Sequence, residues 1–129
     1  MIERTNAAGL SQPPGYSHVV VASGRRLVTT AGAVPLDAEG NLVGPGDRHA
    51  QARQTLENLA SALEAVGATG RDVIKTTVYV VAGERADLGF VWAAVQESGI
   101  AGAASTLLGV SMLAIEGQLV EIEAIAVLE

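Results

Sequence analysis

Two carboxylates stand inside an otherwise apolar run near the end of the chain, Glu121 and Glu123 in the segment from Leu119 to Leu128. The alternation of this run predicts an extended strand in which both carboxylates lie on the same face. A carboxylate in a covered strand is unfavourable unless it is paired, hydrogen-bonded or used in chemistry. Glu121 is therefore either a base that activates water or a structural carboxylate paired across a sheet.

Few other residues have the type and spacing that catalysis requires. Ser105 has no His–Asp relay beside it, so we interpret it as a small strand residue rather than a nucleophile. His18 is interpreted as a satisfied strand histidine and His49 as a solvated residue at a helix start, and the two lack metal-ligand spacing. Lys75 is the partner that we expect for Glu123. Tyr16 either caps a cleft or is an aromatic at the rim of a sheet.

The elements that must position these residues follow from periodicity and turn signals. β-Branched and alternating runs predict strands over 16–22, 27–33, 73–81, 104–110 and 119–128. The first two of these strands are expected to form a hairpin through Ser23-Gly24-Arg25-Arg26, in which both arginines are solvated, and a second turn follows over 37–41. Helical periodicity predicts one helix between an Asp47 N-cap and Gly67 and another from Arg85 to Glu97.

The apolar stripe of the first predicted helix contains the following residues: Ala52, Leu56, Leu59, Ala60 and Leu63. On the second helix, we interpret Trp92 as packing between helix and sheet. The residues before Tyr16 are predicted to be a polar start that ends in the loop Gln12-Pro13-Pro14-Gly15, where two prolines exclude a helix.

The order of these elements predicts one α+β domain over residues 1–129, a mixed β-sheet with two helices packed on one face. The other face has no partner in the chain, and its strand residues are largely apolar. Hydrophobic residues make up 49% of the chain and aromatic residues only 3%. An apolar face of this kind favours a subunit that associates with copies of itself.

Charge and composition narrow the functional classes. The net charge of −6 gives no general attraction to phosphate backbones, so nucleic-acid binding is disfavoured. The absence of cysteine excludes disulfides, thiolate metal sites and cysteine catalysis. No signal-peptide-like or bilayer-length apolar run is seen, so we expect a cytoplasmic protein without a membrane partner.

Five segments together resemble the RidA (YjgF) family, in that family's order and over nearly the whole chain. The segments are Pro14–Ser17, Thr30–Pro35, Gln51–Leu59, Asp72–Val80 and Glu121–Val127. The resemblance implies a chorismate-mutase-like, RidA-like fold assembled as a homotrimer, with the sheets in a central barrel and the helices outside. It also implies small-molecule clefts at the subunit interfaces.

Family members of the RidA type hydrolyse reactive enamines and imines to 2-oxo acids and ammonia, without a metal or an organic cofactor. By resemblance, Tyr16 matches the cleft tyrosine and Gly32 the glycine whose backbone lines the cleft. Glu121 matches the glutamate that holds the attacking water. Tyr16 and Glu121 are thus the catalytic candidates, while Gly32 and Ser105 are the substrate-binding candidates.

Two positions depart from the family's pattern. Ser105 stands where the family has the arginine that grips the substrate carboxylate, and Leu88 or Gly89 stands near the place of a cleft asparagine. Hydrogen bonds to charged groups contribute about 1.5–3 kcal/mol and neutral ones about 1 kcal/mol. We therefore expect poor binding of 2-imino acids, and a neutral or differently charged small ligand suits the cleft better.

Three functions stay open at this stage. The first is a cofactor-independent hydrolase or deaminase acting on C=N bonds of imines, enamines or related metabolites. The second is a non-catalytic, metabolite-binding or regulatory trimer that keeps the cleft without the chemistry. The third, endoribonuclease activity, is an activity sometimes assigned to the family, and the acidic charge of this chain argues against it.

Overall fold

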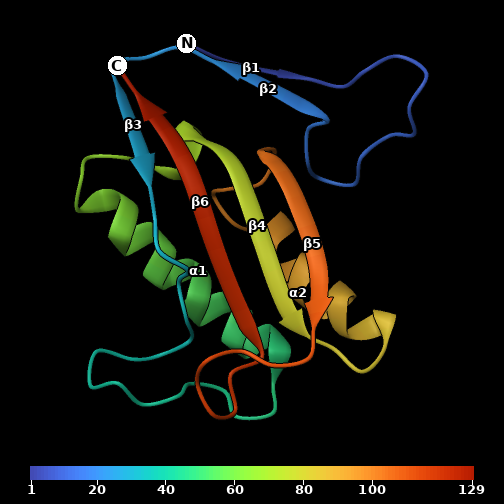
Figure 1. Ribbon diagram of the computed structural model, residues 1–129, viewed down its shortest axis with the longest axis vertical. Helices are drawn as coiled ribbons and strands as arrows, with labels where there is room; N and C mark the ends of the chain where they lie inside the picture. The colour runs from blue at the N-terminus through green and yellow to red at the C-terminus, as the bar shows by residue number, and fades with distance from the viewer.

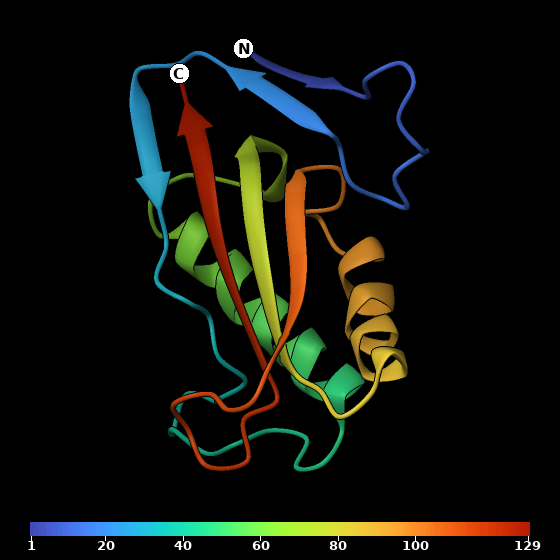
Figure 2. The ribbon, with the colours of Figure 1, turned by 45° about the vertical axis from the view of Figure 1, so that its right-hand side comes forward.

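Two helices lie behind a four-stranded sheet, and a short two-stranded ribbon crosses one end of that sheet (Figures 1 and 2). A computed structural model describes residues 1–129. The elements in chain order are β1 (Ile2–Thr5), β2 (Val19–Ala22), β3 (Arg26–Thr29), α1 (Arg48–Glu64), the 3₁₀ turn η1 (Gly70–Asp72), β4 (Val73–Val81), α2 (Arg85–Gln96), β5 (Ala104–Val110) and β6 (Val120–Leu128). The predicted order is confirmed from β2 onward.

The main sheet has the strand order β3-β6-β4-β5. β4 and β5 run parallel, whereas β6 is antiparallel to both of its neighbours, so the sheet is mixed as predicted. Helix α2 connects the two parallel strands, which cannot be joined by a tight turn. The predicted α+β class, with both helices on one face, is confirmed (Figure 1).

Alternate residues of the central strands form the core against the helices. Val78, Ile122 and Ala126 are fully buried on this side of β4 and β6. They pack with Leu59 of α1 and Val91 of α2, both also fully buried. Because strand side chains alternate between faces, the intervening residues of the same strands point away from the helices.

Helix α1 begins where the sequence predicts. The Asp47 side chain accepts a hydrogen bond from the Ala50 N–H at 3.0 Å, and the helix ends at Glu64 with Ala65 as its C-cap, before the predicted Gly67, whose φ is +80°. The predicted stripe is wrong at Ala60, which is exposed, while Gln51 and Thr55 are fully buried. The helix is thus turned so that a hydrogen-bonding side chain, Gln51, faces the loops at the end of the sheet.

The predicted hairpin between residues 16–22 and 27–33 is wrong. β2 instead pairs with β1, a strand that the polar start did not indicate, and β3 pairs with β6. Gly24 lacks the positive φ that a tight hairpin turn requires, and the linker leads from one sheet to the other. Arg25 N–H donates to the Leu128 carbonyl at 2.9 Å, which fixes this crossing.

The face of the main sheet that points away from the helices, here called the open face, is more polar than predicted. Leu27, Ile125 and Val127 form an apolar zone along β3 and the end of β6, and Leu27 is 70% exposed. Polar side chains occupy the centre of the open face, where the register brings together Thr77 with Glu123 and Tyr79 with Glu121. The prediction of an apolar open face therefore holds at one end only.

Candidate functional site

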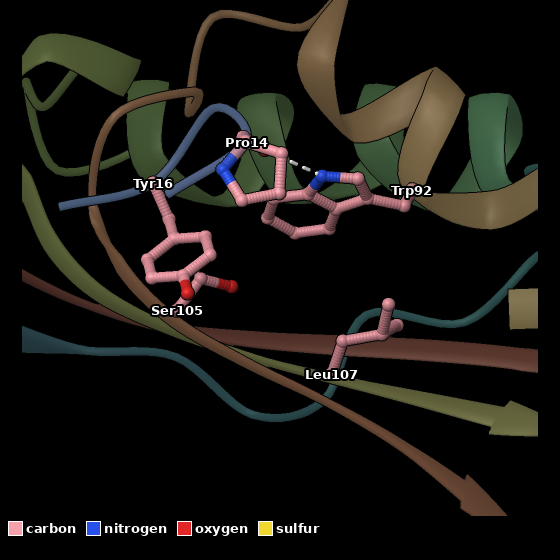
Figure 3. A pocket seen from close by; sticks show the side chains of 5 residues that line it. All are labelled: Pro14, Tyr16, Trp92, Ser105 and Leu107. Carbon is pink, nitrogen blue, oxygen red and sulfur yellow. Dashed lines mark hydrogen bonds between the residues drawn. The ribbon is translucent and has the colours of Figure 1, made fainter. Parts of the chain in front are cut away.

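A cavity of about 280 Å³ lies at the β5 edge of the sheet, on the side of α2. It is lined by Pro14, Tyr16, Trp92, Ser105 and Leu107, whose side chains surround one space in Figure 3. The Tyr16 and Trp92 ring centroids are 6.2 Å apart, at an interplanar angle of 71°. The structure thus brings two of the predicted site residues, Tyr16 and Ser105, to the same cavity. We call it the aromatic pocket.

Backbone hydrogen bonds hold Tyr16 in the aromatic pocket from both sides. Ser17 N–H donates to the Ala103 carbonyl at 3.2 Å, and Gly102 N–H donates to the Gly15 carbonyl at 3.0 Å. The Ser17 hydroxyl adds a bond to the Gly102 carbonyl at 2.6 Å. The segment around Tyr16 is therefore fixed to the loop that begins β5, and β5 carries Ser105.

Ser105 already accepts one hydrogen bond. The buried Thr76 hydroxyl donates to Ser105 Oγ at 2.7 Å across the parallel β4–β5 pair. The Ser105 O–H remains available to a ligand in the aromatic pocket, because a serine hydroxyl has one donor and two acceptor positions. The Ser105 hydroxyl is a single neutral donor, whereas an arginine at this position would bind a carboxylate through two charge-assisted hydrogen bonds.

Glu121 lies on the open face, half-buried at the start of β6. The side-chain amide of Gln118, which is 3% exposed, donates to Glu121 Oε1 at 3.1 Å. Gln118 is itself fixed, since Ile115 N–H donates to its Oε1 at 3.2 Å and its Nε2 also reaches the Val120 carbonyl at 3.0 Å. The carboxylate is thus held in one orientation by a buried amide.

Gly32 lies directly against Glu121. Paired hydrogen bonds between Ala33 and Ile122, at 2.8 and 3.2 Å, bring the segment after β3 beside β6. A Cβ at position 32 would be 2.7 Å from Glu121 Cγ and would overlap the carboxylate. The lack of a side chain at Gly32 therefore leaves the space that the Glu121 carboxylate occupies.

The four predicted site residues fall into two pairs on opposite sides of the sheet. Ser105 pairs with Thr76, which faces the helices, whereas Glu121 pairs with Tyr79 on the open face. Within one chain, Tyr16 and Ser105 therefore line the aromatic pocket, whereas Gly32 and Glu121 lie in contact with each other on the open face. One chain alone does not bring all four residues to one cavity.

The predicted pair between Glu123 and Lys75 is wrong. The Tyr79 hydroxyl donates to Glu123 Oε1, and Lys75 Nζ instead donates to the Thr106 hydroxyl at 2.9 Å. The hydrogen bond to Glu123 is the main reason that the pKa of Tyr79 lies above 10.0, helped by partial burial and by the negative charges of Glu123 and Glu121. Glu123 pairs with Thr77 in the register, so Lys75 and Tyr79 are both its diagonal neighbours, and it is the phenol of Tyr79 that bonds to the carboxylate.

Two residues that the sequence did not assign to the site support it. Trp92 packs against the core as predicted, but it also lines the aromatic pocket, and its Nε1 donates to the Pro14 carbonyl at 2.8 Å. Gln118 lies in the loop between β5 and β6 and orients Glu121. The proline-rich loop gave no signal for the Trp92 bond, whereas a glutamine three residues before Glu121 is a spacing that sequence reasoning can note.

The remaining candidates have structural surroundings. His18 precedes β2, accepts a hydrogen bond from Ala7 N–H through Nδ1 at 3.1 Å, and lies edge-on to Tyr16 with ring centroids 6.1 Å apart. No group of three or more His, Asp or Glu side chains is placed to hold a metal ion. Neither helix has the length and apolarity that crossing a lipid bilayer requires.

The chain thus combines an α+β fold with a small cavity at one sheet edge and a hydrogen-bonded carboxylate on the open face. Comparison with known families makes this specific. The family model described as endoribonuclease L-PSP matches residues 9–128, and the chain therefore belongs to this family, which includes the RidA/YjgF proteins.

Solved structures agree with this assignment. The chain is similar to YyfB of Yersinia pestis, described as a protein of unknown function of the conserved Rid family, at 35% identity and a TM-score of 0.90 over 98% of both chains. It is also similar to the YjgF gene product of Escherichia coli, at 31% identity and a TM-score of 0.67, covering 96% of this chain and 92% of that one.

Among curated proteins, the chain is similar to the 2-iminobutanoate/2-iminopropanoate deaminase of Salmonella typhimurium. The two are 44% identical over 54 residues, which span 42% of this chain and only 41% of that protein. The name of this relative links the family to imine metabolites. Because the similarity covers less than half of that protein, it does not identify the substrate of this chain.

Proposed function

We propose that this protein hydrolyses carbon–nitrogen double bonds of small imines, releasing ammonia, at clefts shared between three copies of the chain. The observation that carries the proposal is the Glu121 carboxylate, oriented by the buried Gln118 amide and flanked by the bare backbone of Gly32. A carboxylate held in one orientation can bind a water molecule and take its proton. The deaminase name of a relative supports the imine class.

We propose a cleft shared between copies because, within one chain, the pair Tyr16 and Ser105 lies on the other side of the sheet from the pair Gly32 and Glu121. In the proposed cleft, Gly32 and Glu121 of one copy face Tyr16 and Ser105 of the next. The apolar zone of the open face, which includes the 70% exposed Leu27 and the 36% exposed Ile125, supplies surface that association would bury. A closed ring of three copies gives three equivalent clefts and leaves no such face open.

The proposed reaction balances without a cofactor. Glu121 takes a proton from water while the water oxygen bonds to the imine carbon, and the π electron pair of C=N moves to nitrogen. Starting from a protonated imine, this gives a neutral carbinolamine, whose nitrogen takes up the proton from Glu121. The C–N bond then breaks as the C=O bond forms, and the hydroxyl proton passes through Glu121 to the departing ammonia, which leaves as ammonium. Tyr16 and the Gly32 backbone hold the substrate during these steps.

The first test measures ammonia release from an imine generated in place by a flavin amine or amino-acid oxidase. We expect Glu121→Gln to lower the rate by about 100-fold or more, since general base catalysis contributes on that scale. Gln118→Leu keeps the base but frees its orientation, so a loss of about tenfold is expected. The exposed Glu57 on α1 gives the control, Glu57→Gln, at the wild-type rate. Full activity in Glu121→Gln would refute the proposed role.

Complementation tests the shared cleft. Tyr16→Ala and Glu121→Gln are each expected to be inactive, but a 1:1 mixture refolded together contains about one quarter of clefts with both wild-type residues. Activity near that fraction supports sharing between copies. An inactive mixture, with a solution mass of three chains, would contradict a cleft shared between copies.

A second candidate, a non-catalytic metabolite-binding trimer, is favoured by one observation. Ser105 offers the aromatic pocket only a neutral donor, so chemistry on carboxylated imines is weakened there. Thermal stabilisation by a ligand without turnover of any imine would support this function instead. RNA cleavage has no comparable support, because a net charge of −6 repels a phosphate backbone.

A further inference from the structure

The aromatic pocket contains no charged side chain. Its walls are two aromatic rings, a leucine, a proline and the Ser105 hydroxyl. The Trp92 N–H is already given to the Pro14 carbonyl, which also accepts from Gln96 Nε2 at 3.2 Å. What Trp92 offers to a ligand is thus its ring surface, not a hydrogen-bond donor.

The cationic groups nearby are also engaged or turned to other partners. Arg4, which approaches the loop before β5 at Gly102, donates Nη2 to the carbonyls of Arg71 and Val73 at 3.0 and 3.1 Å. His18 lies edge-on to Tyr16 and uses Nδ1 as an acceptor. The chain as a whole carries a net charge of −6. An anionic ligand therefore meets no counter-charge among the lining residues, and the overall field opposes its approach.

Aromatic faces carry negative electrostatic potential and attract cations within about 6 Å of the ring centre. Two such rings, from Tyr16 and Trp92, meet at this pocket with centroids 6.2 Å apart. A desolvated cation beside them is bound more tightly than an uncharged molecule of the same shape by roughly tenfold. The pocket thus combines attraction for a positive charge with no compensation for a negative one.

We infer that the aromatic pocket selects substrates by charge, taking the protonated imines of simple amines, which are cations without a carboxylate, in preference to 2-imino acids. The inference rests on the proposed function for the reacting C=N bond. The balanced reaction is R₂C=NH₂⁺ + H₂O → R₂C=O + NH₄⁺, with no oxidant or cofactor. It assigns a substrate class that differs from the one in the name of the Salmonella relative, whose two substrates are both carboxylates.

Trp92 is the one tryptophan of the chain, so its fluorescence reports this pocket directly. We would titrate the protein with three molecules of matched shape: choline, its uncharged analogue 3,3-dimethyl-1-butanol, and the anion 3,3-dimethylbutanoate. Choline is expected to bind about tenfold more tightly than the alcohol, and the anion more weakly than both. Equal binding of choline and the alcohol, tightest binding of the anion, or binding of none of the three would overturn the inference.

Variants separate ring attraction from shape. Trp92→Phe keeps an aromatic face and is expected to retain choline-dependent thermal stabilisation, whereas Trp92→Leu is expected to lose most of it. Ser105→Arg introduces a guanidinium and is expected to reverse the order, so that the anion binds best. A Ser105→Arg protein that still prefers choline would contradict the assignment of the binding place.

Turnover is tested with a matched pair of imines that share one side chain. A flavin amine oxidase acting on 3-methylbutylamine gives the cationic imine, and an amino-acid oxidase acting on leucine gives the carboxylated one. We expect kcat/KM for ammonia release to be at least about tenfold higher for the first. Preference for the leucine-derived imine would overturn the inference and leave the proposed function standing. Choline binding without turnover of either imine would refute the proposed function and leave charge selection standing.

Discussion

The two faces of the main sheet are made by alternate residues of the same strands, yet they differ in burial and in polarity. On the helix side, Val78 and Ile122 are fully buried among other apolar side chains. On the open face, Ile125 is 36% exposed, and Tyr79 is bonded to Glu123. The helix side is thus a buried apolar core, whereas the open face is a partly exposed surface whose polar side chains form hydrogen bonds with one another. The comparison separates residues that stabilise the chain from residues that are free to serve a site or an interface.

The largest difference between the faces is expected from matched truncations on β6. Ile122→Ala should lower the free energy of unfolding by about 2–5 kcal/mol, because it leaves a cavity in the core. Ile125→Ala removes a side chain that is already partly exposed, and about 1 kcal/mol is expected in dilute protein. Urea denaturation measures both. Equal losses in dilute protein would show that the open face contributes as much core as the helix side.

Protein concentration sharpens this prediction. If copies associate through the open face, the loss from Ile125→Ala grows as the protein concentration is raised, whereas the loss from Ile122→Ala stays the same. Phe90, 55% exposed on α2, is a control on the other side of the molecule. A concentration dependence at Phe90→Ala instead would place the contact between copies on the helices.

How far the sequence predicts the fold depends on the range of the forces involved. The alternation in β6 and the helical period of α1 are local, and both elements are found where predicted. The partner of β2 is not local, since Val19–Ala22 pairs with Ile2–Thr5 rather than with the next strand. Turn residues suggest a hairpin, but Gly24 does not adopt a positive φ and the partner of β2 comes from the start of the chain.

The second prediction concerns two buried polar residues on α1, and it tests how much their hydrogen bonds contribute to stability. Gln51 is fully buried, donates to the Gly44 and Gly117 carbonyls and accepts from Leu119 N–H at 2.7 Å. Gln51→Leu leaves these groups unpaired, so a loss of about 2–3 kcal/mol is expected in urea denaturation. The hydroxyl of Thr55, equally buried, has no partner. Thr55→Val is therefore expected to be neutral or slightly stabilising, and a large loss there would reveal an unrecognised partner.

The site was harder to predict than the core, for a physical reason. Family resemblance indicated Tyr16 and Glu121, but alternation along a strand says only that Ser105 and Thr106 face opposite ways, not which of them faces the helices. That answer comes from the register between β4 and β5. Trp92 and Gln118 act through hydrogen bonds to segments distant in sequence or to a turn, which no periodicity encodes.

The two groups with displaced pKa values lie on different sides and act at opposite ends of the pH range. Asp87 of α2 accepts from Gly83 N–H at 2.9 Å and from Glu84 N–H at 3.2 Å, and Arg48 is 3.5 Å away. These contacts, the Gly83 bond first, outweigh its burial and lower the pKa of Asp87 below 3.8. The unfolded chain then binds the proton more readily, so this stability is present above pH 3.8 and is lost as pH falls through the lowered value. Asp87→Asn should flatten the acid limb of Tm against pH, whereas Glu57→Gln should not. An unchanged limb in Asp87→Asn would contradict the assignment.

Tyr79 gives the smallest and most specific test, on the open face. Its pKa lies above 10.0, so its contribution to stability is present below pH 10.0 and is lost as pH rises through the raised value. The chain has two tyrosines, and absorbance titration of the phenols should show a late step that Tyr79→Phe removes. Glu123→Gln removes the charge that accepts the Tyr79 hydrogen bond, so it should bring this step down further than Glu121→Gln, which removes a charge alone. If Lys75→Met moved the step more than Glu123→Gln, Lys75 and Glu123 would be partners after all. The polar centre of the open face would then be organised by an ion pair rather than by the phenol.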